Sequence, residues 1–163
     1  MTTVEAGAET WPKVFLVGPA AQRISAAWNA RATQVCLDHG LQGLHAESAE
    51  GAVAAAQSKF ASDRLLLWRA DAVIADLTPF RGRATDGAVY WQCGFAEALD
   101  KPVFGWSGSP DDAAADDGGR GDVTARDDVA NASLLIASLA APVAPSLEAA
   151  VRACRAWFNG QFA

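Results

Sequence analysis

Three side chains between residues 70 and 106 have the type and the position to bind a ligand or to move a proton. Asp76 ends an apolar run, Asp86 comes directly before a helical pattern, and Gln92 falls in the second turn of that pattern. An aspartate at such places commonly caps a turn or a helix. At the carboxyl end of a strand in an open α/β sheet it also lies at the edge where ligands bind. Both interpretations stay open for Asp76, and for Asp86 the cap and the ligand contact are compatible.

The residues around these three indicate what kind of ligand could bind. Gly82 and Gly87 would let the backbone approach a ligand closely, and the helix N-terminus would favour an anionic group such as a phosphate. Arg81 and Arg83 carry charge that either pairs with such a group or remains in solvent. Gln92 is equally compatible with an ordinary polar residue that faces solvent or a neighbour. The aromatic residues beside it, which either pack a core or interface or stack on a flat base, are Tyr90, Trp91 and Phe95.

The elements that must position these residues form a strand–loop–helix–strand unit, with strands at 71–77 and 103–106 and a helix at 86–99. Before this unit the pattern predicts a strand at 13–18, a helix at 22–39, a short strand within 41–46, and an alanine-rich helix in one or two pieces that ends near residue 68. After it come an acidic, glycine-rich loop at 107–128, a helix at 129–139, an extended segment at 140–145 that would make only a poor edge strand, and a helix from 146 to about 158. Alternating strands and helices predict an open α/β sandwich, with residues 1–12 as a loose arm and 13–163 as a single domain.

Composition excludes several classes of function. The chain has 163 residues, of which 51% are hydrophobic, and a net charge of −6, so we expect a globular protein that does not bind nucleic acid. Its three cysteines match no zinc or redox motif, which predicts reduced, mostly buried thiols in a cytoplasmic protein. We find no signal peptide, membrane span, P-loop, dinucleotide fingerprint or Ser-His-Asp signature. His39 and His45 have no partners that suggest a metal, so we expect neither a metal nor a cofactor.

The motifs taken together resemble a known family. The stretches are VFLVGPA at 14–20, DAVIADLTPFRGRATDG at 71–87, CGFAEALDKPV at 93–103 and the closing helix. In combination they resemble the nucleoside 2-deoxyribosyltransferases. This resemblance implies a flavodoxin-like, doubly wound open parallel sheet in a three-layer sandwich, and a homo-oligomer whose active sites are shared between subunits. It also implies cleavage of the N-glycosidic bond of a 2′-deoxynucleoside, in which a glutamate attacks the anomeric carbon and forms a covalent deoxyribosyl-enzyme.

The resemblance assigns roles residue by residue. Asp76 corresponds to an aspartate at the end of the strand, and Asp86 to an aspartate that helps to hold the sugar hydroxyl. Phe15 stands where the family often has a tyrosine. Asn131 is the nearest candidate for an asparagine that a partner subunit supplies. The other residues that the resemblance places at the substrate are Gly18, Pro19, Phe80, Arg81, Gly82 and Gly87.

The nucleophile position departs from the family pattern, because it holds Gln92 instead of glutamate. A neutral amide is a far weaker nucleophile and supplies no negative charge to an oxocarbenium-like transition state. An engineered trap would explain that single change. It would not explain the neighbouring residues that replace smaller ones, Val89, Tyr90 and Trp91, so we favour natural divergence of the pocket. Cys93 is a poor substitute, because one residue along a helix turns the side chain by about 100°.

Two functional hypotheses follow, with a third that is weaker. The first is an enzyme that transfers deoxyribose to another base or hydrolyses the N-glycosidic bond, with activity weakened or altered by Gln92. The second is a protein that binds a nucleoside or nucleotide in the same pocket without turnover. The third is an oligomeric scaffold in which the aromatic cluster forms the interface. Release of free base distinguishes the first hypothesis from the second.

Overall fold

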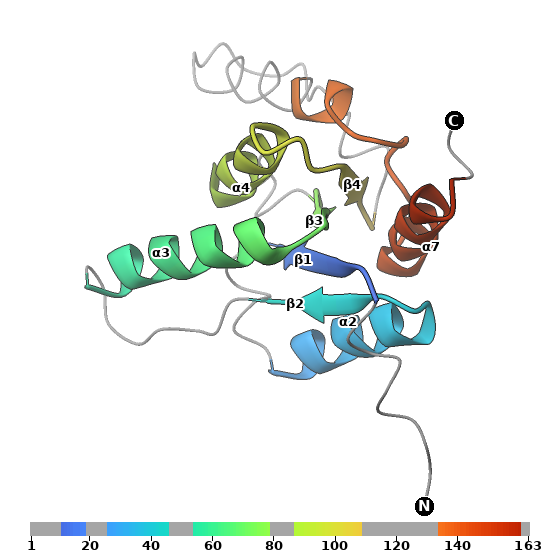
Figure 1. Cartoon of the computed structure of the whole chain (residues 1–163), viewed down its shortest axis with the longest axis horizontal. Coiled ribbons are helices and arrows are strands. Elements are labelled where there is room, and N and C mark those ends of the chain that lie inside the picture. Colours follow the sequence, from blue (N-terminus) through green and yellow to red (C-terminus); the bar gives the residue numbers. More distant parts are fainter. Residues whose placement is uncertain (1–10, 19–25, 46–53, 79–86, 109–133, 161–163) are drawn as a thin grey trace, which may run out of the picture.

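The computed structural model describes residues 11–18, 26–45, 54–78, 87–108 and 134–160 (Figure 1). Its strands and helices alternate, as predicted. In chain order they are β1 (Lys13–Val17), α2 (Ala26–Asp38), β2 (Gln42–Leu44), α3 (Ala54–Arg69), β3 (Ala72–Asp76), α4 (Gly87–Glu97), β4 (Val103–Trp106) and α7 (Leu147–Phe158). Most of the predicted arm and most of the predicted acidic loop lie outside the described residues.

The four strands form one parallel sheet in the order β2-β1-β3-β4. The chain passes from β1 to β2 on one side and returns to β3 on the other, so the strand order reverses between β1 and β3. Open α/β sheets bind ligands beyond the carboxyl ends of the strands at such a switch point. Val17 pairs with Ala75 here, so Gly18 and Asp76 follow at the same edge. The predicted flavodoxin-like, doubly wound sheet is confirmed.

Helices cover both faces of the sheet and make the sandwich three layers thick (Figure 1). Because side chains alternate along a strand, each strand supplies two cores. Phe15 and Val17 pack on the side of α3 and α4, whereas Val14 and Leu16 pack on the side of α2 and α7. All five residues of β3 are buried. This burial on both faces explains why β3 appears in the sequence as a nearly continuous apolar run.

The two helices on the α3–α4 side follow the prediction closely. α3 is a single continuous helix within the described residues, one of the two alternatives that the sequence left open. α4 ends at Glu97, two residues earlier than predicted. Asp100 in the following turn has a φ of 54°, and the Lys101 amide donates to the carbonyl of Ala96 at 3.0 Å. This left-handed turn, which aspartate tolerates better than most residues, ends the helix and directs the chain into β4.

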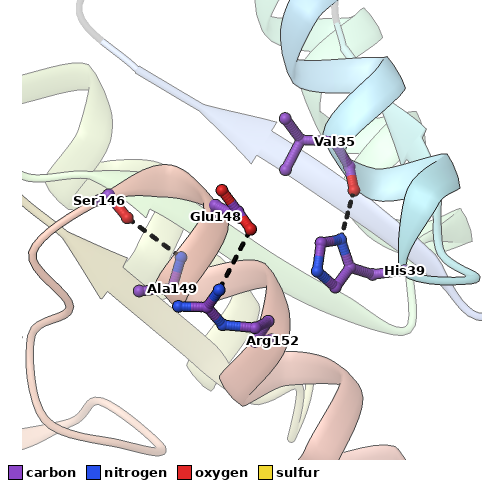
Figure 2. Close-up of polar contacts among 6 residues, drawn as sticks. All are labelled: Val35, His39, Ser146, Glu148, Ala149 and Arg152. Carbon is purple, nitrogen blue, oxygen red and sulfur yellow. Dashed lines mark hydrogen bonds and ion pairs between the residues drawn. The ribbon is translucent and has the colours of Figure 1, made fainter.

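α7 begins and packs as its sequence predicts. The Ser146 hydroxyl oxygen accepts a hydrogen bond from the Ala149 amide at 3.2 Å, and Glu148 pairs with Arg152 one turn later at 3.1 Å (Figure 2). Val151 and Cys154 are buried on the inner face. On α2, His39 Nδ1 donates to the Val35 carbonyl at 2.9 Å, a local contact that fits a structural role for this histidine (Figure 2).

The segment before α7 follows the edge of the sheet without forming a strand. Residues 134–137 are helical, and the rest of the predicted helix before them lies outside the described residues. Between 140 and 145, Ala144 makes one parallel bridge to Trp106 and no longer ladder within the described chain. This agrees with the poor edge strand that two prolines predict. No helix among the described residues combines the length and the apolar character needed to cross a membrane.

Candidate functional site

Asp76 is the best-defined polar group at the switch point. It is the last residue of β3, it is fully buried, and one carboxyl oxygen accepts a hydrogen bond from the Thr78 amide at 2.9 Å. The other oxygen, Oδ2, has no hydrogen-bond partner among the described residues. Burial raises the pKa of the Asp76 carboxyl above its ordinary value, and its hydrogen bonds to Thr78 only partly oppose this. Burial therefore makes ionisation of Asp76 less favourable than that of an exposed aspartate.

Thr78 connects the two segments that leave the sheet beside Asp76. Its hydroxyl oxygen accepts a hydrogen bond from the Gly108 amide at 3.2 Å, and the Leu77 amide donates to the Trp106 carbonyl at 2.8 Å. The ends of β3 and β4 are thus tied together where the chain turns away from the sheet. This holds the carboxyl group of Asp76 by its neighbours in sequence and by the adjacent strand.

Gln92 lies in a polar chain that joins α4 to α3. Its Nε2 donates to Asp63 Oδ2 at 2.7 Å, and the Lys59 ammonium contacts the same oxygen at 2.5 Å. Gln92 is fully buried and Asp63 is 3% exposed. The amide oxygen of Gln92 has no partner within the described part of the chain. The sequence allowed Gln92 to face either solvent or a neighbouring residue. In the structure its side chain contacts a neighbouring helix, α3.

The sheet separates the groups that the sequence placed together. Phe15 packs on the face that α3 and α4 cover, which is also the face of Gln92. Alternation along β3 assigns Asp76 to the opposite face, with Ala72 and Ile74. None of the hydrogen bonds in the described structure joins Asp76 to Gln92. A ligand that reaches both side chains would have to lie across the ends of β1 and β3, where the adjoining loops lead to opposite faces.

The remaining predicted site residues are tested only in part. Gly18 is buried at the end of β1. Gly87 is exposed at the start of α4, and a Cβ there would meet no described atom within 4 Å, so the described structure does not by itself require glycine. The predicted residues that lie outside the described ranges are Pro19, Phe80, Arg81, Gly82, Asp86 and Asn131.

The aromatic residues near Gln92 pack on the protein itself. The Trp91 ring lies 4.8 Å from that of Phe60 and 5.8 Å from that of Phe95, measured between centroids. Tyr90, Trp91 and Phe95 are half-buried against the core between the sheet and α4. These contacts support a packing role along the seam between α3 and α4.

Cys93 does not provide an alternative nucleophile. It is buried, and desolvation raises the pKa of its thiol to about 12, so almost no thiolate exists near neutral pH. The three cysteines are free and buried, as predicted. Within the described ranges, no group of three or more His, Cys, Asp or Glu side chains could hold a metal ion.

The sequence analysis missed Asp63 and Lys59. In the structure Asp63 lies one turn before Leu67 on the same face of α3, and both are buried. From the sequence alone this face could not be identified, because residues 65–68 of the helix are all apolar. The structure turns Asp63 inward, and a buried carboxylate needs a partner. Lys59, one turn earlier, is half-exposed and supplies the opposite charge.

Comparisons with known proteins agree with this fold. The family model described as nucleoside 2-deoxyribosyltransferase matches residues 14–138. The chain is similar in structure to a 2-desoxiribosyltransferase from Leishmania mexicana, with a TM-score of 0.58 and 21% identity over 88% of this chain and 97% of that chain. It is also similar to a 2-deoxyribosyltransferase from Bacillus psychrosaccharolyticus, with a TM-score of 0.48 and 20% identity over 72% of this chain and 82% of that one. A comparison with curated protein sequences gives no match.

Proposed function

The chain belongs to the nucleoside 2-deoxyribosyltransferase family, because the model of that family matches residues 14–138. We propose that the protein binds 2′-deoxynucleosides beside Asp76 and cleaves their N-glycosidic bond. The observation that carries this proposal is the Asp76 carboxyl at the carboxyl end of β3. It is buried, its pKa is raised, and its Oδ2 has no partner among the described residues. An acid with these properties can protonate a leaving base.

The proposed reaction needs one proton and one attacking group. As the bond between C1′ and the base nitrogen breaks, the base takes the bonding electron pair and a proton from Asp76. A water molecule, or a second base, then forms the new bond to C1′ and gives up a proton that returns to the Asp76 carboxylate. General acid catalysis of this kind contributes about 10²- to 10⁴-fold in rate.

Gln92 sets the expected level of activity. An amide carries no negative charge to stabilise the cationic sugar and is a poor nucleophile. Its Nε2 is also hydrogen-bonded to Asp63. We therefore propose slow cleavage without a covalent deoxyribosyl-enzyme, several orders of magnitude below an enzyme with a glutamate nucleophile.

A second candidate function is nucleoside or nucleotide binding without turnover. The observation that favours it is the same uncharged Gln92 side chain, buried and bonded to α3. In that case Asp76 would act only as a hydrogen-bond donor to the ligand. The two functions differ in whether free base appears.

The test is to incubate the protein with a panel of 2′-deoxynucleosides and to measure free base by chromatography, beside Asp76→Asn. We expect slow release that falls about 100-fold or more in the variant. Stabilisation of the protein by a nucleoside in a thermal shift experiment, with no base released, would leave the binding function in place of the reaction. No thermal shift with any nucleoside or nucleotide would refute both.

We also propose a homo-oligomer with shared sites. The observation in this chain that favours it is three large apolar side chains of α3 that remain exposed, Phe60, Leu65 and Trp68, at 47%, 57% and 60%. A contact with a second copy of the chain would remove such side chains from water. Light scattering after size-exclusion chromatography tests this directly, because a monomer at micromolar concentration would contradict it.

A further inference from the structure

A chain of three polar side chains crosses the otherwise apolar seam between α3 and α4. Asp63 Oδ2 accepts a hydrogen bond from Gln92 Nε2 at 2.7 Å and lies 2.5 Å from Lys59 Nζ. Asp63 and Gln92 are both closed to solvent, whereas the Lys59 side chain is 35% exposed. The buried residues that α3 and α4 contribute to the core on this side of the sheet are otherwise apolar, among them Leu67, Val89 and Cys93.

The chemistry of this contact restricts which side chain position 92 can carry. An ionised carboxylate only accepts hydrogen bonds, so the group that faces Asp63 must donate one. The Gln92 amide does so. A carboxylate at position 92 would place two acceptors of like charge in contact where water cannot reach them. A protonated carboxylic acid could donate, but it would then be no nucleophile.

We propose that Asp63 is the positioning residue that selects a hydrogen-bond donor at position 92, so that the carboxylate of this part of the site resides on α3 instead of α4. The same contact fixes the orientation of the amide. Because Nε2 is bonded to Asp63, the oxygen of Gln92 is the end that can accept a hydrogen bond from a ligand.

This proposal implies that a nucleophile cannot be restored at position 92 by one substitution. Gln92→Glu alone leaves two carboxyl groups in contact. Combining it with Asp63→Asn reverses donor and acceptor, because the new amide on α3 donates to the new carboxylate on α4. Both replacements preserve side-chain length, and the trio keeps one carboxylate and one lysine. In its catalytic part, the inference depends on the function proposed above.

The experiment compares four proteins: the parent, Gln92→Glu, Asp63→Asn and the double variant. Each is assayed at neutral pH for melting temperature without ligand and for base release from 2′-deoxynucleosides. Intact mass spectrometry detects an ester, formed as the carboxylate oxygen bonds to C1′ and the base leaves with a proton from Asp76. The matched control is Gln34→Glu on α2, where Gln34 Nε2 donates to Asp38 Oδ1 at the same 2.7 Å but in solvent.

We expect Gln92→Glu to melt roughly 10 °C below the parent and to stay within about tenfold of its base release. The double variant should recover at least half of the melting temperature that Gln92→Glu loses. It should also release base about 100-fold faster than Gln92→Glu and form the ester. Gln34→Glu should melt within about 2 °C of the parent. Failure of Gln92→Glu to fold, with a folded double variant, would support the same conclusion.

Three results would overturn the inference. One is a Gln92→Glu variant that melts with the parent and gains as much activity as the double variant. Another is a double variant that is no more stable than Gln92→Glu, and the third is a double variant that does not fold although Gln92→Glu does. If the melting temperatures behave as expected but none of the four proteins releases base, the pairing of Asp63 with position 92 stands and the proposed reaction is the part that fails.

Discussion

Replacing Gln92 by glutamate should destabilise the folded protein by an amount that grows with pH, and the structure sets its size. The new carboxyl oxygen would lie about where Nε2 now lies, 2.7 Å from Asp63 Oδ2. If both groups were ionised, Coulomb's law with an effective dielectric constant of about 20 gives a repulsion of about 6 kcal/mol. Lys59, in contact with Asp63 and half-exposed, offsets part of this repulsion.

Binding a proton is the less costly alternative. A glutamate has an unperturbed pKa of about 4.3, so holding it protonated at pH 7 costs about 4 kcal/mol, at about 1.4 kcal/mol for each pH unit. The protonated group also donates a hydrogen bond to Asp63 and preserves the contact. Because protonation costs less free energy than the repulsion between two carboxylates, the variant should bind the proton. The expected loss in the free energy of unfolding is about 3–4 kcal/mol at pH 7. This is a large share of the 5–15 kcal/mol that stabilises a typical domain.

The sign of the pH dependence follows from proton binding. In the folded variant the new carboxyl would have a raised pKa, so it holds a proton that the unfolded chain has released above pH 4.3. Stability relative to the parent therefore falls as pH rises from about 4.5 to 7. At about pH 4.3 half of the unfolded chains already hold this proton, so the difference between variant and parent is small there and disappears at lower pH.

The assay is urea unfolding of the parent, Gln92→Glu and Gln34→Glu at several pH values between 4.5 and 7. For Gln34→Glu we expect a loss of only about 0.2–0.5 kcal/mol, because the Gln34 and Asp38 side chains are exposed and lie one turn apart. A loss for Gln92→Glu that does not change with pH, or that is no larger than the loss for Gln34→Glu, would refute the reasoning. It would mean that Gln92 and Asp63 do not meet in a closed environment.

Three further predictions concern the rest of the described structure. Asp76→Asn should gain stability relative to the parent as pH rises above the ordinary aspartate pKa of about 4. Burial raises the pKa of Asp76, so the folded parent loses stability as its carboxyl is forced to ionise, whereas asparagine does not ionise; urea unfolding at pH 4 and 7 measures the difference. Gly105→Ala should cost about 1–3 kcal/mol in the same measurement, because its Cβ would lie 2.5 Å from Leu77 Cδ1 and 2.9 Å from Leu139 Cδ1. Ser146→Ala should cost about 1 kcal/mol in thermal unfolding through loss of the α7 cap, and an unchanged midpoint would contradict that role.

The order of the elements was predictable because local signals and tertiary structure agree. β3 is buried on both faces, so its apolar run identified it without knowledge of its neighbours. Ser146 marked the start of α7 through a contact only three residues away. The end of α4 was less predictable. The chain turns there through a left-handed residue, Asp100, which has no strong preference for that conformation in the sequence.

The place of Asp76 in the fold was predictable from the sequence, whereas the contact of Gln92 was not. Asp76 ends an apolar run that forms β3, so its position at the carboxyl edge of the sheet needs only the strand itself, and its role at a ligand stays a prediction. The contact of Gln92 joins residues 29 positions apart on two helices, and no local pattern encodes such a pairing. Asp63 was hidden in an alanine-rich helix in which few large side chains mark the buried face.

The energetics of the Asp63–Gln92 contact support a role at the site over a role in holding the helices together. A buried charged group loses hydration, and its partners recover that cost only in part, so apolar side chains of similar volume are often equal or better for stability. Residues 67, 89 and 93 on the same seam are of this apolar kind. A carboxylate placed among them, with a donor on one side and a half-exposed cation on the other, is a costly way to join two helices. Besides joining the helices, the contact fixes the orientation of the Gln92 amide and restricts position 92 to side chains that can donate a hydrogen bond to Asp63. Both of these properties affect the chemistry of the edge where α4 begins.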